Sequence, residues 1–303
     1  MTNNADPFSL DIRRFGPCAA DVLSGDASGS VVGVFRRCFY VHLDDSYICM
    51  GNTDFSDGPI NVVTSAPHTT DWQASGLTSG APARLSNHRL RLGPHLTFSL
   101  NRARIWRPAR PGIAPVSARS LTTLRRFFAA SPPVAGLAPQ VFGAPVAALP
   151  QAEHPLRALS LWLAQNLTAH PDHQQEPPVE KLLGLGPGLT PSGDDFLAGV
   201  LITLAALGET RARLHLAGAI RTHAPAATNP ISAQHLYAAT AGLGGAAIHD
   251  LFAALQTDNP DSQRAALKNL VAVGHTSGWD ALAGLYRTLN IWQSARQNEI
   301  IAA

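Results

Sequence analysis

The sequence predicts an α+β protein in which a mainly antiparallel β domain, barrel-like or sandwich-like, precedes an α-helical domain. Short apolar segments separated by Asp, Gly, Asn and Pro occupy residues 31–100, which is typical of strands and turns. Beyond residue 118, apolar residues recur at helical spacing, as in Leu156, Leu159 and Leu163. The chain has 303 residues, of which 45% are hydrophobic, so it can bury the cores of two domains.

The charges are distributed unevenly along the expected strands. Residues 72–152 contain no Asp or Glu, whereas ten arginines lie in residues 84–126. In segments 89–92 and 102–105, arginine alternates with apolar residues, which predicts strands with one basic face. This face is compatible with plain solvation or with an anionic ligand or partner subunit. Nucleic acid is not expected, because no aromatic platform, helix-turn-helix pattern or zinc-ligand spacing accompanies the arginines.

Two stretches rich in Pro, Gly and Ala separate the two parts. Residues 107–117 and 131–150 have the composition of a semi-rigid connection. We therefore predict a β domain with the basic face over residues 1–117, a connection over residues 118–150, and a helical domain over residues 151–303.

Composition also restricts the compartment. The first twenty residues lack the uninterrupted apolar core of a secretory signal, and the longest apolar run, residues 196–207, is shorter than the roughly 20 residues of a membrane span. Three cysteines without a CxxC pair favour reduced thiols: Cys18, Cys38 and Cys49. We expect a cytoplasmic protein that does not act in a membrane.

The motif that carries chemistry is KLLGLGPGLTPSGDDFLAG, residues 181–199. Its alternating glycines predict a turn that needs positive φ or close backbone approach: Gly184, Gly186 and Gly188. Thr190 or Ser192 then caps a helix that continues to Gly208. Free backbone N–H groups, the helix dipole and the two hydroxyls together predict an anion site.

Asp194 and Asp195 lie at this helix start and leave three roles open. They could satisfy the helix dipole, orient a substrate amide or water, or bind magnesium. Nucleotide binding is not supported, because no Gly-Lys-Ser/Thr follows the glycines and their spacing differs from G-x-G-x-x-G.

A second copy of the device follows downstream. SGWDALAG, residues 277–284, repeats SGDDFLAG, residues 192–199, at six of eight positions. His275 precedes it and is a candidate general acid or base, or a loop residue that bonds a carbonyl. Asn229 and Ser232 mark a third helix start, and we expect the three starts to converge on one pocket.

Three blocks within residues 184–285 carry a family resemblance: GPGLTPSGDDFLAG, TNPISAQHLYAATAG and GHTSGWDALAG. They resemble the family of the small third subunit of oxamate carbamoyltransferase (AllH type), formerly a bacterial domain of unknown function. The N-terminal half shares mostly FSDGPINVV with it. The resemblance implies purine (allantoin) catabolism, in which a multisubunit enzyme transfers a carbamoyl group between oxalurate and phosphate, giving oxamate and carbamoyl phosphate.

We therefore expect a subunit of a carbamoyltransferase complex with larger partner subunits and a small anionic substrate. No cofactor is expected, with magnesium as the alternative. The rival hypotheses are a stand-alone metal-dependent hydrolase and a non-catalytic scaffold subunit, and the sequence leaves open whether the chain is active alone. The catalytic candidates are Asp194, Asp195 and His275. The substrate-binding candidates are Gly186, Gly188, Thr190, Ser192, Gly193, Asn229, Ser232, Thr276, Ser277 and Asp280.

Overall fold

The computed structural model describes the chain except residues 1–7, 110–115, 144–148, 169–174, 258 and 303. The chain divides into two compact units, residues 1–108 and 109–303. Each unit has its own hydrophobic core.

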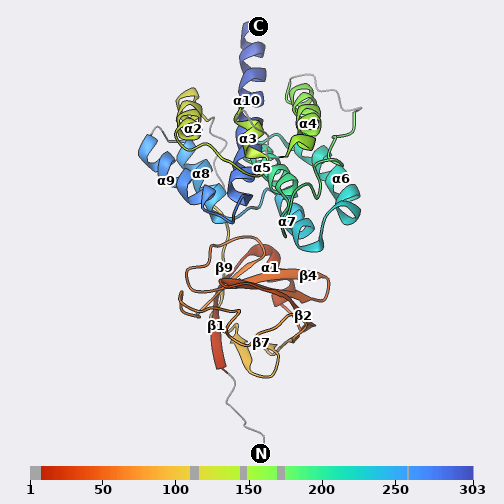
Figure 1. Cartoon of the computed structure of the whole chain (residues 1–303), viewed down its shortest axis with the longest axis vertical. Helices are drawn as coiled ribbons and strands as arrows, with labels where there is room; N and C mark the ends of the chain where they lie inside the picture. Colours follow the sequence, from red (N-terminus) through yellow and green to blue (C-terminus); the bar gives the residue numbers. More distant parts are fainter. Residues whose placement is uncertain (1–7, 110–115, 144–148, 169–174, 258, 303) are drawn as a thin grey trace, which may run out of the picture. The chain divides into compact units, whose positions relative to one another are not determined.

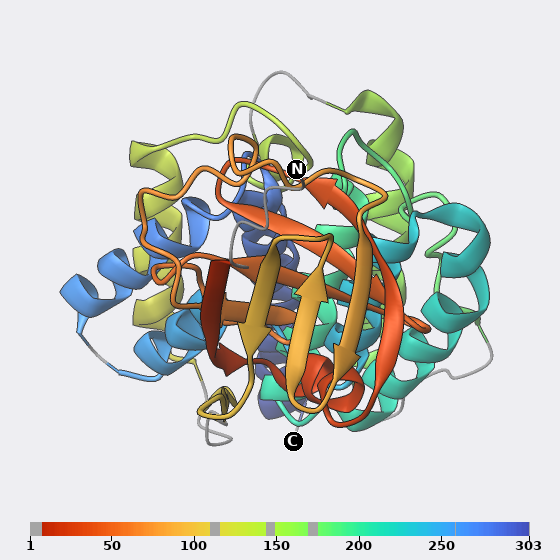
Figure 2. The same ribbon diagram turned by 90° about the horizontal axis from the view of Figure 1, so that it is seen from below.

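The N-terminal unit is a closed β-sheet with one short helix, α1 (Pro17–Leu23). Its strands run in the order β5-β4-β3-β2-β6-β7-β8-β1, and β5 also pairs with β1, so the sheet closes on itself; β9 pairs with β1 as well. Figure 2 shows these strands side by side. The strands are β1 (Phe8–Phe15), β2 (Ala27–Val34), β3 (Cys38–Leu43), β4 (Ser46–Gly51), β5 (Asn61–Thr64), β6 (Pro82–Ser86), β7 (Arg89–Leu92), β8 (Leu96–Ser99) and β9 (Arg104–Ile105). The predicted mainly antiparallel, barrel-like first part is confirmed.

Side chains alternate between the barrel core and the outside. In β7, Leu90 and Leu92 are buried while Arg89 and Arg91 are exposed, as the period of two predicts. Arg84 of β6 lies opposite Arg91, so the outer face here is basic. The alternation predicted for residues 102–105 does not hold, because Ile105 is 46% exposed.

The C-terminal unit is helical, as predicted. Helices α5 and α10 lie at its centre, with α2, α8 and α9 on one side and α4, α6 and α7 on the other (Figure 1). The helices are α2 (Ala118–Ala130), α3 (Ala138–Val141), α4 (Glu153–Asn166), α5 (Ser192–Ala206), α6 (Thr210–Ala227), α7 (Pro230–Thr240), α8 (Ala246–Leu255), α9 (Pro260–Val271) and α10 (Ser277–Ala302), with a short 3-10 turn η1 (Pro150–Ala152) before α4. Within the residues that the structure describes, every helix is too short or too polar to span a bilayer.

The stretch 118–150, which composition suggested as a connection, contains α2 and α3. Leu121, Leu124 and Phe128 of α2 and Leu137 beside α3 belong to the core of the helical unit. These residues therefore contribute to the packing of the second unit.

Helices α5 and α10 touch through their backbones. A Cβ atom on Gly199 would lie 2.1 Å from the carbonyl oxygen of Ala281, and one on Gly284 would lie 2.1 Å from that of Phe196. Neither glycine can carry a side chain without moving the partner helix. Glycine at both positions thus fixes how closely the two central helices approach.

Candidate functional site

The glycine-rich turn before α5 has three residues with positive φ, namely Gly184 (+70°), Gly186 (+111°) and Gly188 (+100°). They serve different purposes. A Cβ on Gly184 would lie 2.0 Å from the carbonyl oxygen of Ala227, so this glycine permits close packing. A Cβ on Gly188 would meet nothing within 4 Å, so this glycine is needed for its backbone conformation and borders open space.

Backbone N–H groups are left without acceptors where this turn enters α5. Within the described part of the chain, no acceptor is found for the N–H groups of Gly186, Gly188, Leu189, Thr190 and Ser192. The first residues of any helix lack an intrahelical acceptor, and Pro191, the residue before α5, provides no side-chain cap. These donors and the positive end of the helix dipole create a region that favours negative charge.

Asp194 is buried and fully engaged by the protein. Its Oδ1 accepts a hydrogen bond from the N–H of Gly184 at 2.8 Å. Its Oδ2 accepts bonds from the hydroxyls of Ser232, at 2.6 Å, and of Thr228. Asp194 therefore ties the glycine-rich turn to the start of α7. Thr228 was not among the predicted site residues, although it lies beside the predicted cap Asn229.

Asn229 holds the same two elements together from the surface. Its Oδ1 caps α7 by accepting the N–H of Ser232 at 3.0 Å, and its Nδ2 donates to the carbonyl oxygen of Leu189 at 2.8 Å. Two of the three predicted helix starts, those of α5 and α7, thus meet through Asp194 and Asn229.

The third helix start reaches the site through α10. The hydroxyls of Thr190 and Ser277 lie 3.0 Å apart, and both act as hydrogen-bonding groups on the Asp195 carboxyl. The hydroxyl of Ser192 acts in the same way on Asp280. Each serine of the repeated SGxD sequence therefore contacts the aspartate of the other copy.

This exchange is part of a wider two-fold relation between the copies. The hydroxyls of Thr203 and Thr288, at matching positions, donate to the carbonyl oxygens of Gly199 and Gly284, at 2.7 Å and 2.9 Å. The close backbone approach of Gly199 and Gly284 described above obeys the same relation.

The segments that lead into the helices match as well. A Cβ on Gly193 would lie 1.8 Å from the carbonyl oxygen of Leu182, and one on Gly278 would lie 1.9 Å from that of Leu270. The copies differ at two of the eight positions. At one of them Asp194 corresponds to Trp279, whose ring packs among aromatic side chains.

Burial dominates the electrostatics of the two exchanged aspartates. Loss of hydration raises the pKa of Asp195 to about 8, the hydroxyls of Ser277 and Thr190 lower it, and the negative charge of Asp280 raises it. Burial also raises the pKa of Asp280, against the lowering effect of the Ser192 hydroxyl. Although part of Asp195 reaches the surface, its Oδ2 is buried and has no partner in the described structure. This raised pKa favours the protonated, neutral form of Asp195 at pH 7.

Asp280 has a structural partner that the sequence did not reveal. Its Oδ1 accepts the N–H groups of Leu137, at 2.6 Å, and Ala138, at 3.2 Å, so it caps the start of α3. A Cβ on Gly136 would lie 2.4 Å from this oxygen, which explains the glycine. The partners are 142 and 143 residues away along the chain, and no local pattern signals them.

His275 lies apart from these bonds. It is exposed on the turn before α10 and forms no hydrogen bond or ion pair with residues that the structure describes. Thr276 acts as a hydrogen-bonding group on Asp280. Among the described residues, no group of three or more His, Cys, Asp or Glu side chains is placed to hold a metal ion.

Comparison with known families places this geometry in context. Residues 182–289 match the family of oxamate carbamoyltransferase subunit AllH. The match covers roughly a third of the chain and includes the glycine-rich turn and both copies of the repeat. The resemblance of the three sequence blocks is confirmed. No solved structure matches the chain.

Proposed function

We propose that this chain is a subunit of a carbamoyltransferase complex and that it binds an anionic substrate at the AllH-type helix start, residues 184–195. The substrates would be oxalurate or oxamate together with phosphate or carbamoyl phosphate, in purine (allantoin) catabolism. The observation that carries the proposal is the set of backbone N–H groups without acceptors between Gly186 and Ser192, inside the segment that matches the family.

The two aspartates beside these donors are compatible with an anion. The carboxylate of Asp194 is compensated by three donors of the protein. Burial raises the pKa of Asp195 to about 8, so the neutral form of its carboxyl predominates near pH 7. Neither group therefore presents an uncompensated negative charge to phosphate, and the dipole of α5 favours its binding.

A neutral carboxyl also suits the group that is transferred. A protonated carboxyl can donate to a carbonyl oxygen and accept from an amide N–H, and a carbamoyl group offers both. We assign this contact to Asp195, with Thr190 and Ser277 orienting its carboxyl. Asp194 positions the turn, and His275, exposed before the start of α10, is the proposed proton carrier. Carbamoyl transfer develops negative charge on a tetrahedral oxygen, which preorganised N–H donors stabilise.

The larger subunits of the complex would complete the site, and the cytoplasm suits the three free cysteines. An amide contact is favoured over magnesium ligation because Asp194 already accepts three hydrogen bonds and a neutral Asp195 is a poor ligand. The metal-dependent hydrolase and the scaffold remain as outcomes of the test.

Calorimetric titration of the full chain with phosphate, carbamoyl phosphate, oxamate and magnesium tests the proposal. We expect saturable binding of phosphate or carbamoyl phosphate that Gly188→Ala weakens at least tenfold, because the φ of +100° disfavours any Cβ. Gly218→Ala is the matched control, since a Cβ there meets nothing within 4 Å.

Unchanged affinity in Gly188→Ala would place the anion elsewhere. Magnesium-dependent hydrolysis by the isolated chain, lost on chelation, would favour the hydrolase. Absence of binding both to the chain alone and to the reconstituted complex would leave a scaffold.

A further inference from the structure

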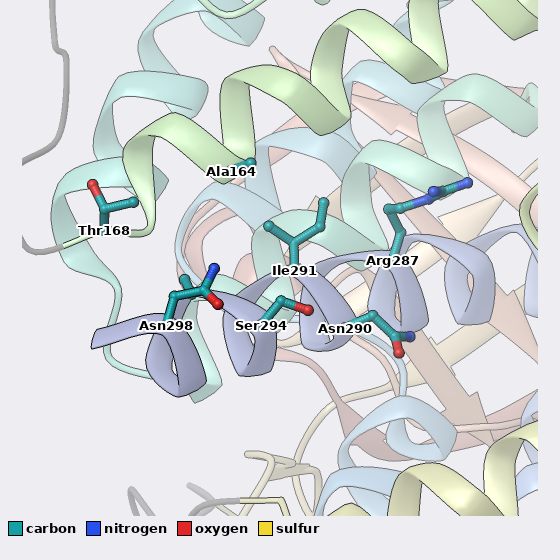
Figure 3. A pocket seen from close by; sticks show the side chains of 8 residues that line it. Ala164, Thr168, Arg287, Asn290, Ile291, Ser294 and Asn298 are labelled. Carbon is teal, nitrogen blue, oxygen red and sulfur yellow. The ribbon is translucent and has the colours of Figure 1, made fainter. Parts of the chain in front are cut away.

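A pocket separate from the helix starts lies between the C-terminal end of α4 and residues 287–298 of α10. Its volume is about 470 Å³, which is within the usual range for small-molecule sites. Figure 3 shows Arg287 and Ile291 projecting from α10 toward the helix that carries Ala164. The polar side chains around the pocket are Thr168, Arg287, Asn290, Ser294 and Asn298.

Within the residues that the structure describes, Arg287 is the only cation lining this pocket, and no counter-charge is found for it. It is half-buried, its Nε is fully buried without a partner, and in the described structure it forms no hydrogen bond or ion pair. Among the described residues, no Asp or Glu lines the pocket. Burial lowers the pKa of Arg287, yet an arginine side chain stays protonated in proteins.

Such an arginine is unusual, because charges removed from water are normally paired. Arg213, which is also half-buried in the helical unit, donates to the carbonyl oxygen of Thr240. Asn290 also lines the pocket, but the hydrogen bond that its Oδ1 accepts comes from Arg125, at 3.0 Å, and not from Arg287. The guanidinium of Arg287 thus lacks, in the part of the chain that the structure describes, the acceptor that its burial requires.

The remaining lining specifies what can supply that acceptor. Ala164, Ile291 and Ala295 provide apolar contacts, and the hydroxyl of Ser294 can donate a hydrogen bond, whereas that of Thr168 already donates to the carbonyl oxygen of Gln165 at 3.2 Å. We propose that this pocket binds a small organic anion, whose carboxylate or phosphate pairs with the guanidinium of Arg287 and whose carbon skeleton packs on the apolar wall. This site is independent of the proposed carbamoyltransferase function, because it shares no residue with the helix starts.

Three probes separate charge from apolar contact in a titration of the full chain. We expect hexanoate and hexyl phosphate to bind saturably, and hexan-1-ol, which has the same carbon chain without the charge, to bind at least tenfold more weakly. Inorganic phosphate serves as a further probe. If hexyl phosphate binds more tightly than both inorganic phosphate and hexanoate, an organic phosphate is the preferred class. If hexanoate binds more tightly than hexyl phosphate, a carboxylate is preferred.

Variants locate the site. Arg287→Gln should reduce hexanoate affinity at least tenfold and Arg287→Lys less, whereas Arg126→Gln, an exposed arginine of α2, should leave it unchanged. The ¹⁵N resonance of the Arg287 Nε, assigned by its absence in Arg287→Lys, should shift on addition of hexanoate.

A measurement of thermal stability tests the same assignment without any added anion. In the absence of anion, Arg287→Met should raise the melting temperature, because it removes an unpaired, partly buried charge. Equal binding of hexanoate and hexan-1-ol, unchanged affinity in Arg287→Gln, or an Nε resonance that does not move would overturn the assignment.

Discussion

Replacing Asp195 by Asn should remove a specific pH dependence from the stability of the protein. The folded state holds the proton of this carboxyl up to about pH 8, whereas the unfolded chain releases it above roughly pH 3.9. Between these values the folded state binds more protons than the unfolded state. Raising the pH therefore lowers the free energy of unfolding of the wild type.

The magnitude follows from the width of this window. Each pH unit within this window lowers the free energy of unfolding by about 1.4 kcal/mol. Between pH 5 and pH 7 this one group should therefore lower the free energy of unfolding of the wild type by at most about 2.7 kcal/mol. For a domain of the size of the helical unit, a change of about 1 kcal/mol in the free energy of unfolding shifts the melting temperature by roughly 2 to 4 °C. The melting temperatures of wild type and Asp195→Asn should diverge by about 5 to 11 °C over these two pH units.

Thermal unfolding followed by circular dichroism at pH 5, 6 and 7 measures this divergence. Asp250→Asn is the matched control, since Asp250 is exposed on α8 and forms no bond with described residues. Its curve should run parallel to that of the wild type. Parallel curves for wild type and Asp195→Asn would refute the view that burial holds this carboxyl protonated.

Substitutions at three further positions, Gly199, Asp194 and Asn229, test the packing of the site by thermal or denaturant unfolding. Gly199→Ala should destabilise by about 1 to 3 kcal/mol through overlap with α10, whereas Gly218→Ala should stabilise by up to about 1 kcal/mol; equal effects would contradict the backbone contact. Asp194→Ala should cost at least about 3 kcal/mol, because it leaves three donors without an acceptor, and Asp194→Asn should cost less. Asn229→Ala should cost about 1 kcal/mol as a lost cap and Asn229→Gly only a few tenths; a larger loss in the glycine variant would argue against capping.

Local patterns in the sequence were sufficient to predict the elements of the site. Alternating glycines predicted the turn, and Asn229 before a proline predicted the cap of α7. The start of α5 was located correctly, but the predicted cap by Thr190 or Ser192 is wrong, because the helix begins at Ser192 after Pro191, which has no side-chain cap. The period of two predicted the exposed arginines of β7. These features depend on neighbours within a few residues, which a sequence displays directly.

The different roles of Asp194 and Asp195 could not be predicted from local sequence patterns. Adjacent residues of a helix point about 100° apart, so one carboxyl faces Thr228 and Ser232 while the other faces Ser277. Which direction leads to which neighbour depends on how α5 packs against α7 and α10. That packing is tertiary and leaves no local signal.

Composition was misleading for residues 118–150 for a related reason. Ala and Pro are common in connections, yet Ser117 caps a helix by accepting the N–H of Ser120 at 3.2 Å, and buried Leu121 and Leu124 hold this helix against the core. Closure of the barrel through β1 and β5 is equally non-local, since Ile12 pairs with Thr64.

The glycine contacts between α5 and α10 have a mechanical consequence. Side chains can change rotamer to accommodate a displacement, but the backbone contacts at Gly199 and Gly284 cannot adjust in this way. Asp280 and Arg287 lie on one continuous helix, two turns or about 10 Å apart along its axis. We therefore expect a displacement at the far end of α10 to move the starts of α5 and α10 together.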